Sequence, residues 1–192
     1  MSPVRILALG GSTRPGSSSE KALRIAAQAA EEAGASVTMI TGRDLMLPIY
    51  DTESEAREPK AVALVEAVRS ADGLLISSPG YHGGISGMMK NALDYIEDLR
   101  QDDPAYLHGR AVGCIAVAYG WQATVSTLHQ LRQVTHALRG WPTPLGGTVN
   151  ASVTGFADDG TINDAATQDQ LRTIGLQVVE FARMRAAHDG AN

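Results

Sequence analysis

The chain has 192 residues, of which 44% are hydrophobic and 19% are charged, and its formal net charge is -5. This composition is ordinary for a globular protein that is long enough to bury one substantial core, and we expect a single domain over residues 1–192. The mild acidity and the lack of any Lys/Arg block argue against nucleic acid as a partner.

The apolar runs of this sequence have the length of strands, well short of the roughly 20 residues that a membrane span needs. The first residues enter a predicted strand directly, without the pattern of a signal peptide. We therefore expect a cytoplasmic protein with no membrane partner. Cys114, the single cysteine, lies in an apolar run, which favours a small buried side chain over a catalytic thiolate.

The chain alternates between continuous apolar runs and segments with helical spacing. Extended segments are predicted at 4–9, 36–40, 73–77, 111–118 and 144–149, and helices at 18–33, 57–70, 85–99, 124–138 and 164–185. Repeated alternation of this kind predicts a doubly wound α/β domain, with a parallel sheet of five strands and helices on both faces.

Some packing details follow from the same pattern. Pro79 and Gly80 are expected to end the third strand. Two apolar sets are expected to be buried: Leu23, Ala26, Ala27 and Ala30 on the first helix, and Val62, Val65 and Val68 on the second. In the irregular stretch 43–52, Leu45, Leu47 and Ile49 are expected to be partly packed.

Ligands of doubly wound sheets bind outside the carboxyl ends of the strands. The loops to consider are therefore 10–19, 78–86 and 119–124. The first has neither the G-x-G-x-x-G of a dinucleotide turn nor the Gly-Lys-Ser/Thr of a nucleotide triphosphate loop. It offers hydroxyls and one guanidinium, which suit a terminal monophosphate: Ser12, Thr13, Arg14, Ser17, Ser18 and Ser19. Alternatively, the serines only cap the following helix and Arg14 is a solvated surface residue.

The second loop places Tyr81 and His82 between two small, flexible turns. Its glycines allow the backbone to approach a flat ring closely, so this loop is suited to a planar heterocycle.

These two stretches, GSTRPGSSSEKAL and SSPGYHGGISGMMKNALDYIEDL, resemble the NAD(P)H-dependent FMN reductase family of flavodoxin-like proteins, and AVGCIAVAYGW also agrees with its pattern. The resemblance implies a flavodoxin-like sheet, FMN as cofactor, and NADPH or NADH as co-substrate. It places Ser12, Arg14, Ser17, Ser18 and Ser19 on the flavin phosphate, Pro79, Gly80, Tyr81, His82 and Gly83 along the isoalloxazine, and Gly120 and Trp121 at the remaining side.

One position departs from the family. Many relatives carry Asn shortly after the serines, where this chain has Ser19 and Glu20. Because a carboxylate repels a phosphate, we expect Glu20 to point along the flank of the helix.

The predicted function is hydride transfer from a nicotinamide to N5 of FMN, with the reduced flavin delivered to a monooxygenase or its electrons to a small acceptor. The flavin does this chemistry, so no catalytic side chain is predicted, and His82 is expected to shape its loop or contact the ring. The histidines show no metal-ligand spacing, and no metal site is predicted. The alternatives are a quinone or azo reductase with tightly held FMN, a flavodoxin-type electron carrier, and a regulatory or structural relative.

The predicted helix 85–99 also bears on assembly. Lys90 and Asp94 are spaced to pair along it. Its apolar residues cover more than one stripe, which favours burial against a second subunit: Met88, Ala92, Tyr95, Ile96 and Leu99. Together with the resemblance, this predicts a homodimer or homotetramer. Trp141 is expected to anchor the core or an interface.

Overall fold

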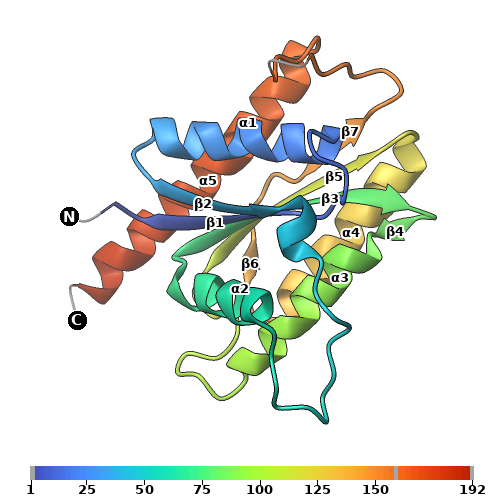
Figure 1. Cartoon of the computed structure of the whole chain (residues 1–192). Helices are drawn as coiled ribbons and strands as arrows, with labels where there is room; N and C mark the ends of the chain where they lie inside the picture. Colours follow the sequence, from blue (N-terminus) through green and yellow to red (C-terminus); the bar gives the residue numbers. More distant parts are fainter. Residues whose placement is uncertain (1–2, 158–159, 191–192) are drawn as a thin grey trace.

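The computed structural model describes residues 3–157 and 160–190, and its centre is a twisted parallel sheet (Figure 1). The strand order is β2-β1-β3-β5, with β6 and β7 both pairing with the outer edge of β5. The strands are β1 (Arg5–Gly10), β2 (Ser36–Thr41), β3 (Gly73–Tyr81), β5 (Ala111–Ala118), β6 (Trp141–Pro142) and β7 (Gly147–Asn150). This is the doubly wound arrangement that the sequence predicts.

The fifth position of the sheet is divided between two short strands. β6 pairs with the start of β5, at Ala111 and Val112, and β7 pairs with its end, from Ile115 to Ala118. The sequence predicts one extended segment at 144–149 and misses β6. Prolines 142 and 144 stand within this stretch, and proline cannot contribute an amide to a continuous ladder.

Helices cover both faces of the sheet (Figure 1). α1 (Ser18–Glu32) and α5 (Ala165–Asp189) lie on one face, and α2 (Pro59–Ser70), α3 (Gly87–Asp94) and α4 (Trp121–Ala137) lie on the other. Successive strand residues alternate between the two cores, as a pleated strand requires: Ile6 and Ala8 face α1 and α5, whereas Leu7 and Leu9 face α2 and α3.

α1 and α5 approach each other very closely. The predicted apolar set on α1 is buried, and a Cβ added at Gly175 of α5 would lie 2.1 Å from the carbonyl oxygen of Ala26. The small residues of α1 permit this approach.

The third strand is longer than the sequence predicts, since β3 passes through Pro79 and Gly80 to Tyr81. β1 ends opposite Ser77, so at Ser78 and Pro79 the only strand paired with β3 in the described residues is β5, and a proline is tolerated at such a one-sided edge. β3 then turns back into β4 (Gly84–Ile85) as an antiparallel hairpin. The predicted helix 85–99 therefore starts at Gly87, and it continues as a 3₁₀ turn over Tyr95–Leu99.

Two predicted packing sets need correction. α2 begins at Pro59, because a residue before proline disfavours the helical conformation, and its buried stripe is Ala61, Leu64, Val65 and Val68. Val62 is instead 47% exposed. In the segment 43–52, Leu45 is buried in a 3₁₀ turn and Leu47 is half-buried, but Ile49 is 82% exposed.

The segment between this turn and α2 is fastened to the chain by polar contacts. The Arg57 guanidinium donates to both carboxylate oxygens of Asp98, at 2.7 and 2.8 Å, and lies 4.8 Å from the centre of the Tyr50 ring. Tyr50 Oη donates to the same carboxylate at 3.0 Å. Hydrogen bonding to Arg57 lowers the pKa of Asp98 below its ordinary value.

The apolar surface expected on helix 85–99 is buried within the chain's own core. Ala92, Tyr95, Ile96 and Leu99 are all buried in the core beside α2, and Met88 is half-buried. The predicted pair of Lys90 and Asp94 is present at 2.6 Å. The apolar argument for a subunit interface on this helix is therefore wrong.

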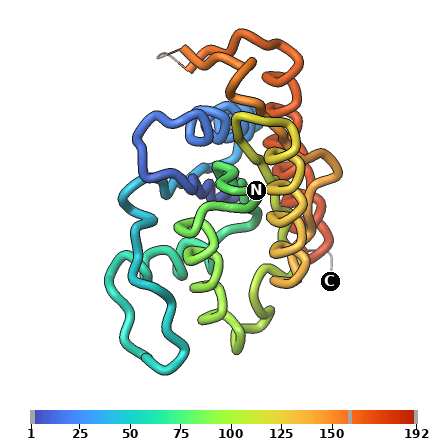
Figure 2. The backbone as a smooth tube through the Cα atoms, turned by 90° about the vertical axis from the view of Figure 1, so that its right-hand side faces the viewer, coloured from blue at the N-terminus to red at the C-terminus, as the bar shows by residue number. Residues whose placement is uncertain are grey.

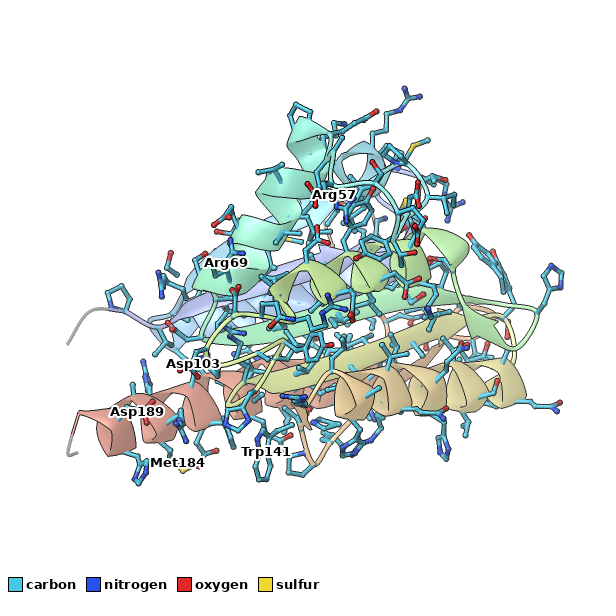
Figure 3. The ribbon with its side chains drawn as sticks, turned by 90° about the horizontal axis from the view of Figure 1, so that it is seen from below. Arg57, Arg69, Asp103, Trp141, Met184 and Asp189 are labelled. Carbon is cyan, nitrogen blue, oxygen red and sulfur yellow. The ribbon has the colours of Figure 1, made fainter. Side chains whose placement is uncertain are left out.

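Large exposed apolar side chains occur elsewhere. Trp141, expected in a core or interface, is 59% exposed at the sheet edge, where its ring centre lies 5.8 Å from that of Phe181. Met184 lies near it on α5 (Figure 3). Among the described residues, no helix combines the length and the apolarity that a membrane crossing requires.

Candidate functional site

A pocket of about 470 Å³ opens where β1, β3 and β5 end. Figure 2 looks onto this edge, with α1 in blue on one side and α4 in yellow on the other. The pocket is lined by Ser12, Thr13, Arg14, Ser17, Ser18, Ser19, Pro79, Gly80, Tyr81, Val117, Ala118, Tyr119, Gly120, Ala123 and Ala151. Three loops that are distant in sequence thus form one cavity of the size that small-molecule ligands occupy.

Nine of the twelve residues predicted for the flavin site line this pocket, and His82, Gly83 and Trp121 do not. His82 and Gly83 form the exposed tip of the β3–β4 hairpin, both with positive φ, of 53° and 85°. Gly83 and Trp121 instead line a neighbouring groove along α4. The tip projects because β3 extends beyond Pro79, which the sequence pattern did not predict.

The hydroxyls of the first loop have different roles. Ser17 Oγ caps α1 by accepting from the amide of Glu20 at 3.2 Å, and it also lies 3.1 Å from Ser19 Oγ. Ser12 Oγ accepts from the amide of Arg14 at 3.3 Å. Ser17 therefore caps α1, as the capping alternative expects, and it also lines the pocket.

Several donors of the same loop have no acceptor among the residues that the structure describes. They are the amides of Thr13, Ser18 and Ser19, the Ser18 hydroxyl and the Arg14 guanidinium. Unsatisfied amides at a helix N-terminus next to a free cation form an anion-binding site. This set matches a phosphate monoester, which carries three strong acceptor oxygens.

Buried serines connect the first loop to the second. The Gly11 amide donates to the Ser77 carbonyl at 2.8 Å, and Ser77 Oγ donates to the Ser19 carbonyl at 2.8 Å. Ser86 Oγ donates to the Gly11 carbonyl at 2.7 Å and accepts from the amide of Met89 at 3.1 Å, where it caps α3. The two sides of the pocket are therefore held at a fixed separation.

The other end of the pocket is less polar. Pro79, Val117 and Ala118 form its wall, and Tyr81 and Tyr119 are exposed by 58% and 79% at its rim. Such a surface accepts a flat ring and leaves one side of it open.

The N-terminus of α4 borders this end. Its N-cap is Gly120, which supplies no capping side chain, and the amides of residues 121–123 have no acceptor within the described part of the chain. These donors favour negative charge beside them.

Gly80 packs directly on α4. A Cβ added at Gly80 would lie 2.6 Å from Thr127 Oγ1, so glycine is required there. Thr127 Oγ1 is itself buried and has no hydrogen-bond partner among the described residues.

Thr13, which the sequence assigns to the phosphate loop, also lines the pocket, and sequence reasoning assigned no binding role to five of the lining residues: Val117, Ala118, Tyr119, Ala123 and Ala151. Tyr119 and Ala123 lie in the loop 119–124 that the strand-end rule selects, so that rule was sufficient to find them. Ala151 follows β7, whose pairing with β5 has no signal in the local sequence.

Other titratable groups do not gather at this pocket. Cys114 is buried as predicted, and burial raises the pKa of its thiol to about 11. Over residues 3–157 and 160–190, no three His, Cys, Asp or Glu side chains come together as a metal site would require.

The strand order defines a flavodoxin-like protein. The pocket agrees with this class, because a loop rich in hydrogen-bond donors follows the first strand and an apolar wall lies beside it, at the point where the strand order reverses. The chain belongs to the NADPH-dependent FMN reductase family, whose model matches residues 4–154. The resemblance seen in the sequence is thereby confirmed.

Individual relatives agree with this family. The "Probable NADPH:quinone oxidoreductase 2" of Oryza sativa subsp. japonica is 33% identical over 134 residues, which are 68% of this chain and 64% of that protein. The "NADPH azoreductase" of Bacillus sp. (strain OY1-2) is 33% identical over 86 residues, which are 44% of this chain and 45% of that protein. The chain thus spans between about half and two thirds of these curated relatives.

A solved structure of FerB, a "flavoenzyme NAD(P)H:(acceptor) oxidoreductase" from Paracoccus denitrificans, superposes with a TM-score of 0.73 at 20% identity, covering 95% of this chain and 98% of that one. This likeness shows the fold.

Proposed function

We propose that this protein is an NAD(P)H-dependent FMN reductase. The observation that carries the proposal is that one pocket has a polar end and an apolar end, which match the phosphate and the ring of FMN. Free hydroxyl, amide and guanidinium donors stand at the first loop, and an apolar wall with exposed aromatic rings stands at the other end. Family membership gives the same assignment.

Within this proposal, Arg14, Ser18 and the amides of Thr13, Ser18 and Ser19 hold the phosphate of FMN. Pro79 to Tyr81 and Val117 to Gly120 hold its ring. The Ser12 and Ser17 hydroxyls, which already accept hydrogen bonds within the loop, fix the loop rather than supply its main donors.

FMN, when bound, accepts a hydride from the nicotinamide and passes its electrons on. The chain's own contribution is placement and electrostatics. The uncapped amides at the start of α4 stabilise negative charge at the ring end, as preorganised donors do. No side chain of the pocket is required as a general acid, and none is assigned.

The test is direct. The purified protein is examined for flavin absorbance, and NADPH and NADH oxidation is followed with and without added FMN. We expect flavin-stimulated oxidation. If the protein neither binds flavin nor oxidises either nucleotide faster when FMN is added, the proposal is wrong.

Arg14→Ala tests the phosphate end. Loss of a charge-assisted contact is expected to weaken FMN binding about tenfold or more, with little change for riboflavin, which lacks the phosphate. Arg100→Ala is the matched control, since Arg100 makes an exposed ion pair with Glu97 away from the pocket. Equal FMN affinity in both variants would assign Arg14 to the solvated surface.

We extend the proposal to the electron acceptor, the oligomeric state and the cellular location of the protein. The relatives' names favour NADPH as the donor and include azo and quinone reduction, so a quinone or azo reductase is the second candidate. FMN that stays bound through purification favours that candidate, whereas FMN that exchanges favours delivery to a monooxygenase. We also propose a cytoplasmic homodimer or homotetramer, and sedimentation at micromolar concentration that detects only monomer would refute that assembly.

A further inference from the structure

A buried carboxylate stands directly behind the phosphate loop. Glu20 lies in the first turn of α1 and is only 8% exposed. Its Oε2 accepts from the amide of Gly16 at 3.1 Å, and its Oε1 accepts from Arg24 at 2.6 and 3.2 Å. It is not among the residues that line the pocket. As expected, Oε1 points along the flank of the helix, toward Arg24, whereas Oε2 turns back to the loop at Gly16.

The second oxygen has a structural task in the loop. Ser17 Oγ accepts from the Glu20 amide while the Glu20 carboxylate returns to the amide of Gly16, a variant of the capping box. Gly16 has a φ of +64°, and a Cβ added there would meet no described residue beyond its chain neighbours within 4 Å, so this hydrogen bond helps to fix its orientation. The same bond removes the Gly16 amide from the donors that an anion can use.

The carboxylate also adds negative charge close to the site of a dianion. Its cationic partner Arg24 has a side chain that is 59% exposed, so solvent screens that charge more than it screens the buried carboxylate. Among the residues that the structure describes, the Arg14 guanidinium at this loop has no ion-pair or hydrogen-bond partner.

We infer that Glu20 sets the affinity of the site for the flavin phosphate: it orders the loop, and its charge keeps FMN bound loosely enough to exchange. This inference rests on the proposed function and deepens it, because exchangeable flavin is a substrate and product rather than a fixed cofactor. Glu20 is a positioning residue, since it acts through the loop and through space.

Glu20→Gln separates the two roles, because a glutamine oxygen still accepts from Gly16 while the charge is gone. We expect its Kd for FMN to fall about tenfold at low salt and its Kd for riboflavin to stay unchanged. The gain is expected to shrink between about 10 mM and about 500 mM salt, where the Debye length falls from about 30 Å to a few Å. Glu31→Gln removes the same charge from the exposed end of α1 and is the matched control.

The readout is titration of both flavins, with thermal unfolding of each variant alongside. An unchanged or reduced preference for FMN over riboflavin in Glu20→Gln would overturn the inference, as would an equal gain in Glu31→Gln. If the wild-type protein binds neither flavin, the proposed function fails first, so the two failures are distinguishable. An increased FMN preference without a change in melting temperature supports the charge effect.

Discussion

Ser86 joins the two loops of the pocket, so its hydroxyl offers a sensitive test of how the site is built. In Ser86→Ala, α3 loses its N-cap, which typically costs about 1 kcal/mol. The carbonyl of Gly11 loses its donor as well, and because Ser86 is 4% exposed, that oxygen is left in a nearly dry environment at a cost of about 1–3 kcal/mol. The free energy of unfolding should fall by about 2–4 kcal/mol.

Urea unfolding at neutral pH measures this change, and for a chain of this length a loss of about 3 kcal/mol lowers the melting temperature by roughly 6–12 °C. FMN affinity should fall as well, because the first loop is no longer held against the second. Ser70→Ala is the control, since Ser70 is exposed and its hydroxyl donates to a carbonyl in its own helix. A loss below about 0.5 kcal/mol in Ser86→Ala, as for an ordinary surface change, would refute the reasoning.

Gly175→Ala should destabilise the protein by about 1–3 kcal/mol despite the better helix propensity of alanine, because the new methyl meets a backbone carbonyl of α1. Gly87→Ala, where an added Cβ meets open space, should be neutral or stabilising in the same urea unfolding assay. Thr127→Val should raise the free energy of unfolding by about 1 kcal/mol, since it removes a buried hydroxyl that has no partner in the described part of the chain. Thr135→Val on the same helix breaks a 2.9 Å hydrogen bond and should lower the free energy of unfolding. Asp98→Asn should cost about 1–2 kcal/mol at neutral pH. The folded-state pKa of Asp98 lies below its ordinary value of 3.8. The stabilisation that the Asp98 carboxylate provides is therefore present above pH 3.8 and is lost as the pH falls through the folded-state pKa. In acid unfolding curves, the difference in stability between Asp98→Asn and the wild type should disappear over that range.

The elements that the sequence predicted best are those whose neighbours lie on both sides. β5 is buried along its whole length and reads as an uninterrupted apolar run, and its predicted bounds, 111–118, are those observed. α1 was similarly clear, because Ser17 and Gly34 mark its ends.

The errors lie at sheet edges, where pairing depends on residues far away in sequence. Pro79 reads locally as a strand end, yet β3 continues through it because β1 has already stopped. The division of the fifth position into β6 and β7 depends likewise on how each piece meets β5. The absence of His82 from the pocket follows from the first of these errors, since the extended hairpin carries its tip away.

The two ends of the pocket differ in how far hydrogen bonds hold their side chains in place, and this difference agrees with the proposed chemistry. At the phosphate end, buried Ser17, Ser77 and Ser86 bond to backbone atoms of other segments or of their own helix, so the donors are fixed before any ligand arrives. Preorganised donors of this kind give selectivity for one anionic group. At the ring end, Tyr81 and Tyr119 are exposed and make no side-chain hydrogen bond among the described residues. A rim of this kind places few demands on the shape of a second flat molecule. In the proposed function, the phosphate end therefore selects the flavin, and the open ring end leaves room for more than one electron acceptor.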